Sequence, residues 1–332
     1  MVPRKAIALL SGGLDSALAA KLMIDQGIEV IGLHLVSPFG CKLPVDDVAR
    51  HLGIRLIKKE KGEAYLELVK HPQYGYGKNM NPCIDCRIYM FQLAEVVMKE
   101  EGADFVVTGE VIGQRPMSQM RHSMELIDSR TALKGLLLRP LSAKTMDPTV
   151  PETKGWVDRE KLMQISGRGR KDQLELAGVI GVTGYAAPGG GCLLTETEFS
   201  NRLRDFFGHE DGLDSARRLA QSQLLHLGRH FRLNEKLKFI IGRNAQENEA
   251  LALLWEKSGA SYMHPETFRG PDAVAVGPID SQTRSLIARV LMRYSKVDPS
   301  QEQEFTFCQG PLAERMRVSG SVNDSELQTW RL

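Results

Sequence analysis

The sequence predicts an α/β protein with a doubly wound parallel sheet, followed by a smaller α+β domain. Short β-rich runs alternate with helical patterns over the first half of the chain, and such alternation favours parallel strands with helices on both faces. A Gly-Ser turn, SGGLDS at residues 11–16, stands where the first strand should end and a helix begin. After about residue 209 the pattern becomes helix, strand, helix, strand, helix, which favours a second domain.

The expected elements follow in order along the chain. Strands are short runs rich in β-branched residues, and helices carry apolar residues at helical spacing. In the first domain we expect strands over 5–10, 29–36, 54–58 and 104–108, and helices over 17–26, 45–52, 88–101 and 196–207. In the second domain the expected strands are 236–242 and 273–276. We place the domains at 1–208 and 215–296, with a C-terminal extension over 297–332.

Composition and charge narrow the class of protein. The chain has 332 residues, of which 42% are hydrophobic and 25% charged, a profile typical of soluble globular proteins with two domains. No apolar run reaches the length of a membrane span, and no signal peptide precedes the first strand. We therefore expect a cytoplasmic protein without a membrane partner. The five cysteines are then expected to be metal ligands or redox groups rather than disulfides.

The SGGLDS turn has the composition of an anion site. Its two glycines let the main chain turn sharply and approach a ligand closely, because no Cβ is in the way. The serines and the first amides of the following helix supply donors, and the helix dipole favours a phosphate there. The turn lacks the lysine of a Walker A loop and the spacing of G-x-G-x-x-G. A plain strand-to-helix turn is the alternative interpretation.

As a whole, SGGLDS resembles the PP-loop of the ATP pyrophosphatase superfamily, which cleaves ATP between the α and β phosphates. The resemblance implies an adenine nucleotide α-hydrolase-like fold that binds ATP and Mg²⁺. It implies that the amides of Gly12 and Gly13, with Ser11 and Ser16, hold pyrophosphate, and that Asp15 orients the loop or holds Mg²⁺. We add His34 and Gly109 to the nucleotide-binding candidates.

Three cysteines form a candidate metal site. Cys83 and Cys86 make a C-x-x-C pair in NPCIDC, directly before a helix, and Cys192 ends the run PGGGC. Three thiolates with an open fourth position suit an iron–sulfur cluster. A structural zinc with His71 as fourth ligand, or a redox or packing role, are the alternatives. For Cys41 and Cys308 we expect packing roles.

Further motifs resemble the PP-loop domain of the tRNA 4-thiouridine synthases. These are TGEVIGQRPMSQ at 108–119, MELID at 124–128 and LLLRPLS at 136–142. NPCIDC and GGGC also resemble the cysteine positions of the bacterial tRNA 2-thiouridylases, and the three-cysteine set resembles the cluster-dependent tRNA thiolases. The resemblance spans about residues 5–195 and implies that Asp15, Cys83, Cys86 and Cys192 are catalytic, with the cysteines holding a [4Fe–4S] cluster.

The second domain is the candidate RNA-binding part. The segment 200–296 carries more basic than acidic residues, and KLKFIIGRNAQENEAL at 236–251 resembles the RNA-binding domain of NFACT proteins. The RNA-binding candidates are Arg232, Arg243, Asn244 and Asn248. A solvated helical face is the alternative interpretation of the basic residues.

The function that these motifs predict is ATP-dependent thiolation of a tRNA uridine, catalysed by a PP-loop sulfurtransferase. The expected partners are tRNA, a sulfur donor such as sulfide or a cysteine desulfurase relay, and a second copy of the chain in a homodimer. Two alternatives stay open, namely a PP-loop enzyme that transfers sulfur or nitrogen to a small molecule, and a non-catalytic RNA-binding protein.

Overall fold

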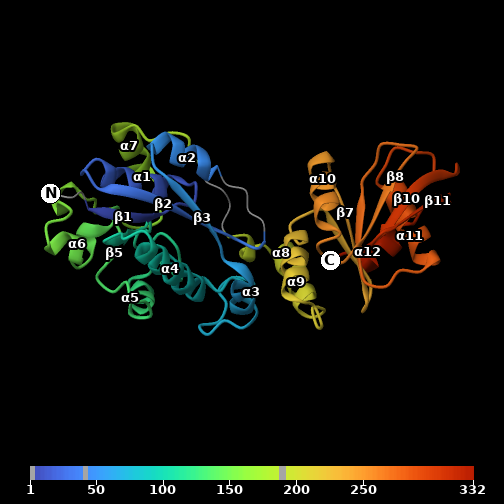
Figure 1. Ribbon diagram of the computed structural model, residues 1–332, viewed down its shortest axis with the longest axis horizontal. Helices are drawn as coiled ribbons and strands as arrows, with labels where there is room; N and C mark the ends of the chain where they lie inside the picture. Colours follow the sequence, from blue (N-terminus) through green and yellow to red (C-terminus); the bar gives the residue numbers. More distant parts are fainter. Residues whose placement is uncertain (1–3, 40–43, 187–191) are drawn as a thin grey trace. The chain divides into compact units, whose positions relative to one another are not determined.

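The computed structural model describes residues 4–39, 44–186 and 192–332, and it divides the chain into two compact units (Figure 1). The first unit comprises Met1–Ser37 and Cys41–Thr195, and the second comprises Pro38–Gly40 and Glu196–Leu332. Helix α8 (Thr197–Phe207), which we expected to close the first domain, lies in the second unit. In the described part of the chain, none of the helices combines the length and the apolar composition that a membrane crossing needs.

A five-stranded parallel sheet in the order β3-β2-β1-β4-β5 forms the first unit and confirms the predicted fold class. The expected strands are present, with ends that differ by one or two residues. The strands are β1 (Lys5–Leu9), β2 (Glu29–Val36), β3 (Leu56–Glu60), β4 (Phe105–Val107) and β5 (Leu137–Leu138). The helices are α1 (Leu14–Ile24), α2 (Val45–Leu52), α3 (Gly62–Lys70), α4 (Cys83–Glu100), α5 (Arg121–Ser129), α6 (Val150–Thr153) and α7 (Lys171–Ile180).

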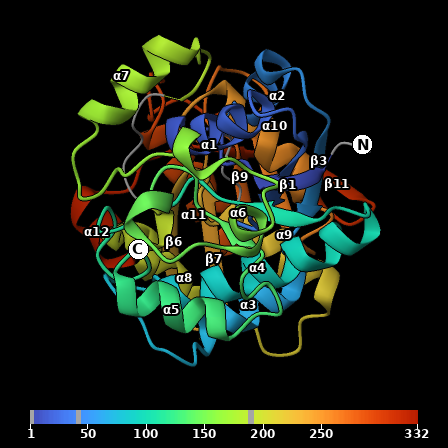
Figure 2. The ribbon, with the colours of Figure 1, turned by 90° about the vertical axis from the view of Figure 1, so that its left-hand side faces the viewer.

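Helices cover both faces of this sheet. Successive strand residues point to opposite faces, and the residues on both faces are apolar. In β1, Ala6 and Ala8 face the cluster that contains α1, α2 and α7, whereas Ile7 and Leu9 face the cluster that contains α4 and α5 (Figure 2). Ile7 is fully buried, so its replacement by alanine is expected to cost roughly 2–5 kcal/mol.

The strand order positions a site at the carboxyl edge of the sheet. Strand β1 pairs with β2 on one side and with β4 on the other, so the chain leaves β1 in one direction and later returns on the opposite side. Ligands bind doubly wound sheets at such a reversal, outside the carboxyl ends of the strands. SGGLDS lies there, between β1 and α1.

The second unit is built on a six-stranded antiparallel sheet in the order β11-β10-β8-β9-β7-β6. Helices α9 and α10 pack with one cluster of the unit, and α11 and α12 pack with another. The strands are β6 (Arg229–Asn234), β7 (Leu237–Ile241), β8 (Ser261–Pro265), β9 (Ala273–Val276), β10 (Gln303–Gln309) and β11 (Leu312–Val318). The helices besides α8 are α9 (Ser215–Leu224), α10 (Ala245–Leu254), α11 (Ser281–Arg293) and α12 (Asp324–Trp330).

The segment 297–332, which we expected to be an extension, completes this sheet. Strand β10 pairs with β8, and Phe305 and Phe307 of β10 are fully buried in the larger cluster. Their burial ties the segment to the core of the unit, since each buried aromatic side chain contributes a large apolar area.

A buried ion cluster joins α8 to two strands of the same sheet. Asp205 accepts two hydrogen bonds from Arg232, at 2.8 and 2.7 Å, and one from Nζ of Lys238 at 2.9 Å. Burial, the largest effect, lowers the pKa of Lys238 to about 8, although Asp205 opposes the shift. Arg232 is thus held in an internal ion pair.

Replacing Asp205 with asparagine is expected to destabilise the folded chain by about 3–5 kcal/mol, because two largely buried cations lose their partner. In the parent protein, the pKa of Lys238 is lower in the folded than in the unfolded chain. The unfolded chain therefore binds more protons there between about pH 8 and 10.5, and this site's contribution to stability rises with pH across that window. Urea unfolding at several pH values measures both effects.

Asp211→Asn is the matched control, since it makes the same charge change at an exposed position. We expect its effect to stay within about 0.5 kcal/mol. An equal, small loss of stability in both variants would contradict the structural role of the ion cluster.

Candidate active site

The SGGLDS loop is folded by its own hydroxyl groups. Gly12 has a φ of +80°, a conformation that side chains rarely adopt, so glycine is required at the turn. The hydroxyl of Ser16 accepts the amide proton of Ser11 at 3.2 Å and donates to the carbonyl of Gly13 at 2.9 Å. These contacts set the shape of the loop at the start of α1.

Asp15 points from the first turn of α1 toward the same edge. Its Oδ2 accepts a hydrogen bond from Nε2 of Gln114 at 3.0 Å. Its Oδ1 is buried and has no hydrogen-bond partner among the described residues. Behind it, a Cβ on Gly109 would lie 2.5 Å from the backbone of Asp15, so only glycine allows β4 and α1 to approach this closely.

A cavity of about 230 Å³ lies at this edge and gathers most of the predicted nucleotide-binding residues. His34 lies at the cavity on β2, where its Nδ1 donates to the carbonyl of Leu10 at 2.9 Å. Gly12 and Gly13 lie in the adjoining loop, and Gly13 also bridges to Ala186. The predicted residues that line the cavity are Ser11, Asp15, Ser16, His34 and Gly109.

Sequence reasoning missed a buried charge network beside this cavity. Glu110 is 2% exposed and accepts a hydrogen bond from Arg139 at 3.0 Å, and Arg87 lies 3.3 Å from its other oxygen. Arg139 also donates to both oxygens of Asp128, at 2.8 and 2.7 Å. Burial, the largest single effect, works to lower the pKa of Arg87, but Glu110 together with Cys86 and Cys83 holds the pKa above its usual value.

The network explains why three separate motifs occur together. Glu110 comes from TGEVIGQ, Asp128 from MELID and Arg139 from LLLRPLS, and each supplies one member of the network. The signal was present as charged residues inside otherwise apolar segments. Such residues are rarely buried unless they are paired.

Two of the candidate thiols lie in the first turn of α4. The thiol of Cys83 lies 3.1 Å from the hydroxyl of Ser118. The thiol of Cys86 lies 3.2 Å from the hydroxyl of Tyr65 and 3.9 Å from Nζ of Lys61. Cys86 thus lies at the start of a helix with an ammonium group and a phenol within reach of its sulfur.

Cys192 is brought toward the same place by the loop 71–82. The amide of Met80 donates to the carbonyl of Leu194 at 3.2 Å, and Asn79 donates to the carbonyl of Thr195 at 2.7 Å. Burial raises the pKa of the Cys192 thiol, with Cys86 contributing in the same direction and Lys61 opposing it.

The three thiols thus share one neighbourhood, but they do not form a ready metal site. All three of them act to raise the pKa of the Tyr65 hydroxyl, after burial as the largest cause. Within residues 4–39, 44–186 and 192–332, no three Cys, His, Asp or Glu side chains lie close enough together to hold a metal ion. Cys308 lies on β10 of the second unit, and Cys41 lies outside the described residues.

One face of α4 joins the thiols to the cavity. Cys83, Cys86 and Arg87 are followed by Met90, a spacing that places these side chains along one side of the helix. Arg87 and Met90 line the cavity, and the sulfur of Met90 lies 3.8 Å from that of Cys86. The thiols are therefore neighbours of the predicted nucleotide site.

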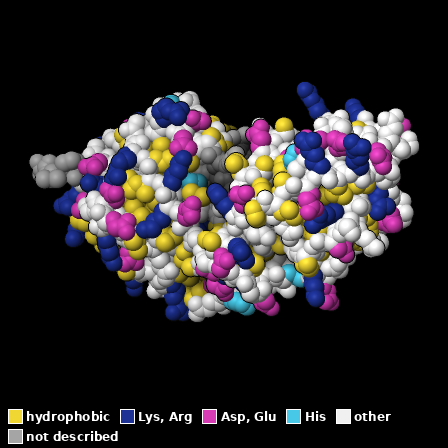
Figure 3. Space-filling view, turned by 45° about the vertical axis from the view of Figure 1, so that its right-hand side comes forward, with side chains coloured by type: hydrophobic (Ala, Val, Ile, Leu, Met, Phe, Trp, Pro, Cys, Tyr) yellow, Lys and Arg dark blue, Asp and Glu magenta, His cyan; other side chains and the backbone are white. Residues whose placement is uncertain are grey.

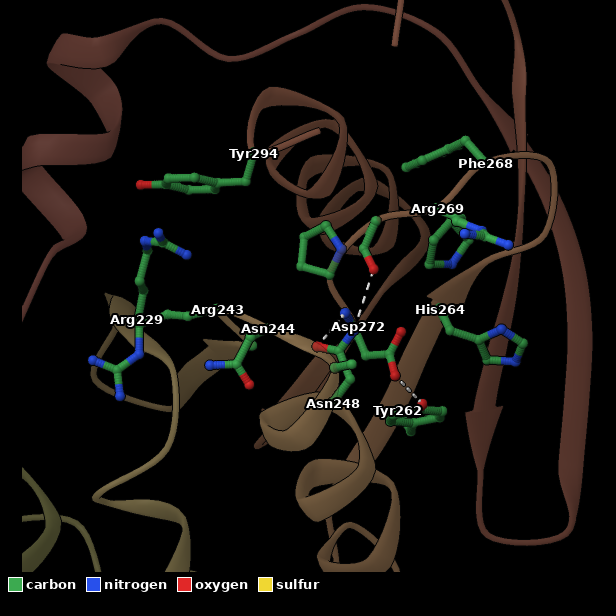
Figure 4. Close-up of a pocket in the computed structure, with 15 residues that line it drawn as sticks. Arg229, Arg243, Asn244, Asn248, Tyr262, His264, Phe268, Arg269, Asp272 and Tyr294 are labelled. Carbon is green, nitrogen blue, oxygen red and sulfur yellow. Dashed lines mark hydrogen bonds between the residues drawn. The ribbon is translucent and has the colours of Figure 1, made fainter. Parts of the chain in front are cut away.

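The second unit separates the four RNA-binding candidates. Arg243, Asn244 and Asn248 line a cavity of about 660 Å³ at the start of α10 (Figure 4). Arg232 does not line it, because its guanidinium is paired with Asp205. Arg243 itself pairs with Glu247 at 2.6 Å, and Asn244 accepts the amide proton of Glu247 as the cap of α10.

A parallel sheet with SGGLDS at its carboxyl edge, a cavity beside that loop and thiols next to the cavity define the first unit as a PP-loop nucleotide-binding domain. Residues 1–149 match the family model described as "Thiamine biosynthesis protein (ThiI)", and residues 228–331 match "NFACT protein RNA binding domain". The two matches confirm the resemblances that the sequence motifs predicted, to a ThiI-type PP-loop domain in the first unit and to the NFACT RNA-binding domain in the second.

The curated relatives are similar over about a third to two fifths of the chain. A "Probable tRNA sulfurtransferase" of Thermococcus kodakarensis is 31% identical over 146 residues, which are 41% of this chain and 36% of the relative. A "tRNA-specific 2-thiouridylase MnmA" of Pelobacter propionicus is 35% identical over 116 residues, which are 32% of this chain and 33% of the relative. The chain spans about a third of the length of the curated relatives it matches.

Among solved structures, a 4-thiouridine synthetase–RNA complex with bound ATP is 26% identical, with a TM-score of 0.36 over 54% of this chain and 52% of that one. The C-terminal part of a fibronectin/fibrinogen-binding protein from Streptococcus suis is 12% identical, with a TM-score of 0.28 over 49% of this chain and 77% of that one.

Proposed function

We propose that the protein thiolates a uridine of tRNA at the expense of ATP. The observation that carries the proposal is the placement of the Cys83–Cys86 pair on the same face of α4 as cavity residues Arg87 and Met90, next to the SGGLDS loop. Relatives named tRNA sulfurtransferase and tRNA 2-thiouridylase, and the NFACT-type domain, support tRNA as the substrate.

In the activation step, a carbonyl oxygen of uridine attacks the α-phosphorus of ATP. A new O–P bond forms, the bond to the β-phosphate breaks, and pyrophosphate leaves. We propose that the SGGLDS loop and the cationic Arg87 hold the phosphates, so that catalysis rests on positioning and on stabilising the leaving charge. The orphaned Oδ1 of Asp15 fits a Mg²⁺ ligand, since Mg²⁺ favours carboxylate and phosphate oxygens. The metal would neutralise charge on the departing pyrophosphate.

In the second step, sulfur adds to the activated ring carbon and the carbon–oxygen bond breaks, so that AMP leaves. Cys83, Cys86 and Cys192 have the donor chemistry of a [4Fe–4S] cluster with three thiolate ligands, which we propose they hold. When bound, the cluster would offer an iron without a protein ligand for the incoming sulfur. Nζ of Lys61 lies 3.9 Å from the thiol of Cys86 and can donate a hydrogen bond to its sulfur.

A persulfide route is the competing account of the sulfur step. One cysteine would then carry the sulfur, and a second would form a disulfide with it as the sulfur leaves, so that an external thiol must restore both. We propose sulfide or a cysteine desulfurase relay as the sulfur donor. We also propose that the protein forms a homodimer. Its compartment would be the cytoplasm, where free thiols persist.

Purified protein is expected to catalyse pyrophosphate–ATP exchange that depends on tRNA, and to form thiouridine in tRNA lacking it. Nucleoside mass spectrometry identifies the product, and a strain without the protein should lose the same nucleoside. Exchange without tRNA would indicate a small-molecule substrate, and tRNA binding without any exchange would indicate a non-catalytic RNA-binding protein. Either result would contradict the proposal.

A further inference from the structure

The cavity of about 660 Å³ in the second unit is assembled from four separate elements. It lies between the start of β6, the turn from β7 into α10, the end of β8 with the loop that follows it, and the end of α11. In Figure 4, Arg229, Arg243 and Asn244 lie on one side, and His264, Phe268 and Arg269 lie on the other. The volume falls in the range of sites that take a small molecule or one nucleotide.

The cavity carries a net positive charge, and two of its arginines have no ion-pair partner among the described residues. Its lining holds three arginines and, among the described residues, one carboxylate, Asp272. Asp272 is already engaged, since it accepts a hydrogen bond from Tyr262 at 2.5 Å. Arg229 and Arg269 form no ion pair with any residue in the described part of the chain. Figure 4 places them on opposite sides of the cavity, so each can contact a different phosphate of a bound chain.

Arg229 is held in place by an aromatic ring. Its guanidinium lies 4.6 Å from the ring centre of Tyr294, at the end of α11. Such a contact fixes the guanidinium plane without consuming its hydrogen-bond donors. The donors therefore stay available for a phosphate oxygen.

A column of three aromatic rings ends at the opposite wall. Trp255 stacks on Tyr262 with ring centres 6.0 Å apart, and Tyr262 lies 5.5 Å from the ring of His264. His264 lines the cavity and is half-exposed. A nucleobase that enters the cavity can extend the column, because stacking tolerates any base.

The floor of the cavity is fixed by hydrogen bonds of the Asn248 side chain. The side chain of Asn248 donates to the carbonyl of Gly270 and accepts the amide proton of Asp272, both at 3.2 Å. A Cβ on Gly242 would lie 2.0 Å from Oδ1 of Asn248, so glycine is required for this contact. Asn248, a predicted RNA-binding residue, thus positions the loop that carries Arg269, and its side-chain amide is engaged within the protein.

One face of the molecule carries charges that do not form a broad basic surface. On the face shown in Figure 3, Lys and Arg side chains lie interspersed with Asp and Glu. Affinity for a polyanion is therefore expected to depend on local sites where cations lack partners, as in the cavity.

We propose that this cavity binds one unstacked nucleotide of an RNA chain, with its two flanking phosphates at Arg229 and Arg269 and its base on the ring of His264. The inference rests on the proposed function, because it assumes that RNA is the ligand of the second unit. Single-stranded loops and ends of RNA offer such splayed nucleotides.

The test uses the full chain and measures binding of a tRNA transcript and of a short single-stranded RNA by fluorescence anisotropy across a salt titration. Arg229→Gln with Arg269→Gln should weaken binding about 10- to 100-fold and lower the salt slope by about 1 to 2, because phosphate contacts are lost. His264→Ala should weaken binding by about 5- to 100-fold with an unchanged salt slope. Arg315→Gln removes the same charge from an exposed position on β11 and should change affinity less than about 2-fold.

Uridine monophosphate serves as the competitor that distinguishes a chain nucleotide from a free one. It should displace the short RNA from the parent, but it should bind the His264→Ala variant too weakly to compete. Binding of uridine monophosphate that the variants weaken, with RNA affinity unchanged in all of them, would assign the cavity to a free nucleotide and overturn the proposal. Arg269→Gln alone, at an exposed position, keeps the test valid if the double variant is unstable by urea unfolding.

The binding experiments distinguish a failure of the proposed function from a failure of the cavity proposal. A parent protein that binds no tRNA would contradict the proposed function itself. A parent that binds and thiolates tRNA, with Arg229→Gln/Arg269→Gln and His264→Ala equal to it, would overturn only the nucleotide cavity.

Discussion

Gly109→Ala is expected to lower the rate of pyrophosphate release by at least about 100-fold while the protein stays folded. The added Cβ would lie 2.5 Å from the backbone of Asp15 and 2.6 Å from the amide of Ser16, far inside van der Waals contact. Relief requires α1 to move away from β4, which displaces the SGGLDS loop from the phosphates. Assays of released pyrophosphate measure turnover, and equilibrium binding measures ATP affinity. We expect ATP binding to weaken less than turnover.

Gly178→Ala is the matched control. Gly178 lies at an exposed position in α7, and a Cβ there meets nothing within 4 Å. We expect unchanged turnover and a gain in stability of about 0.5–1 kcal/mol, since alanine favours a helix. Asp15→Ala should abolish turnover like Gly109→Ala, but without the steric displacement. Full turnover in either variant would contradict the placement of the phosphates at this loop.

The sequence was sufficient for four strands of the first sheet because their signals are local, whereas the two-residue strand β5 was not predicted. Residues 29–36 form a strand with the predicted bounds, and SGGLDS needed only a strand before it and a helix after it. The partners of Glu110 could not be read the same way, because Arg139 lies 29 residues further along the chain. Burial of a charge depends on the tertiary partner, which periodicity does not reveal.

The second unit shows the opposite case, in which local patterns misled. Residues 229–234 read as part of a basic helix, yet they form β6, with Phe231 fully buried and Arg232 turned toward Asp205. A single inward-facing aromatic gives little alternation to recognise. Strand β10 does alternate, with Phe305 and Phe307 buried, but its place in the sheet depends on pairing with β8, about 40 residues earlier in the chain. Of the RNA-binding candidates, Arg243 and Asn244 were found through the NFACT-like motif, whereas Arg229 and Arg269 lie outside it.

Loss of any one of Cys83, Cys86 and Cys192 is expected to remove iron and thiolation together. If the three thiolates hold a cluster, anaerobically purified protein should be brown and contain about four irons per chain. Two remaining thiolates hold a cubane poorly, so each Cys→Ala variant should lose colour and iron. ATP binding should survive, because the SGGLDS loop is a separate element at the end of β1.

Cys308→Ala is the matched control, because Cys308 lies on β10 in the other unit and should keep both iron and activity. The persulfide route predicts a different pattern, with colourless and fully active protein in which only two of the three cysteines are essential. Cys86, with Lys61 beside its thiol, and Cys192, with a pKa raised by burial, would then be the reacting pair. Colourless, active protein after strictly anaerobic preparation would overturn the cluster, because thiolation would then proceed without iron.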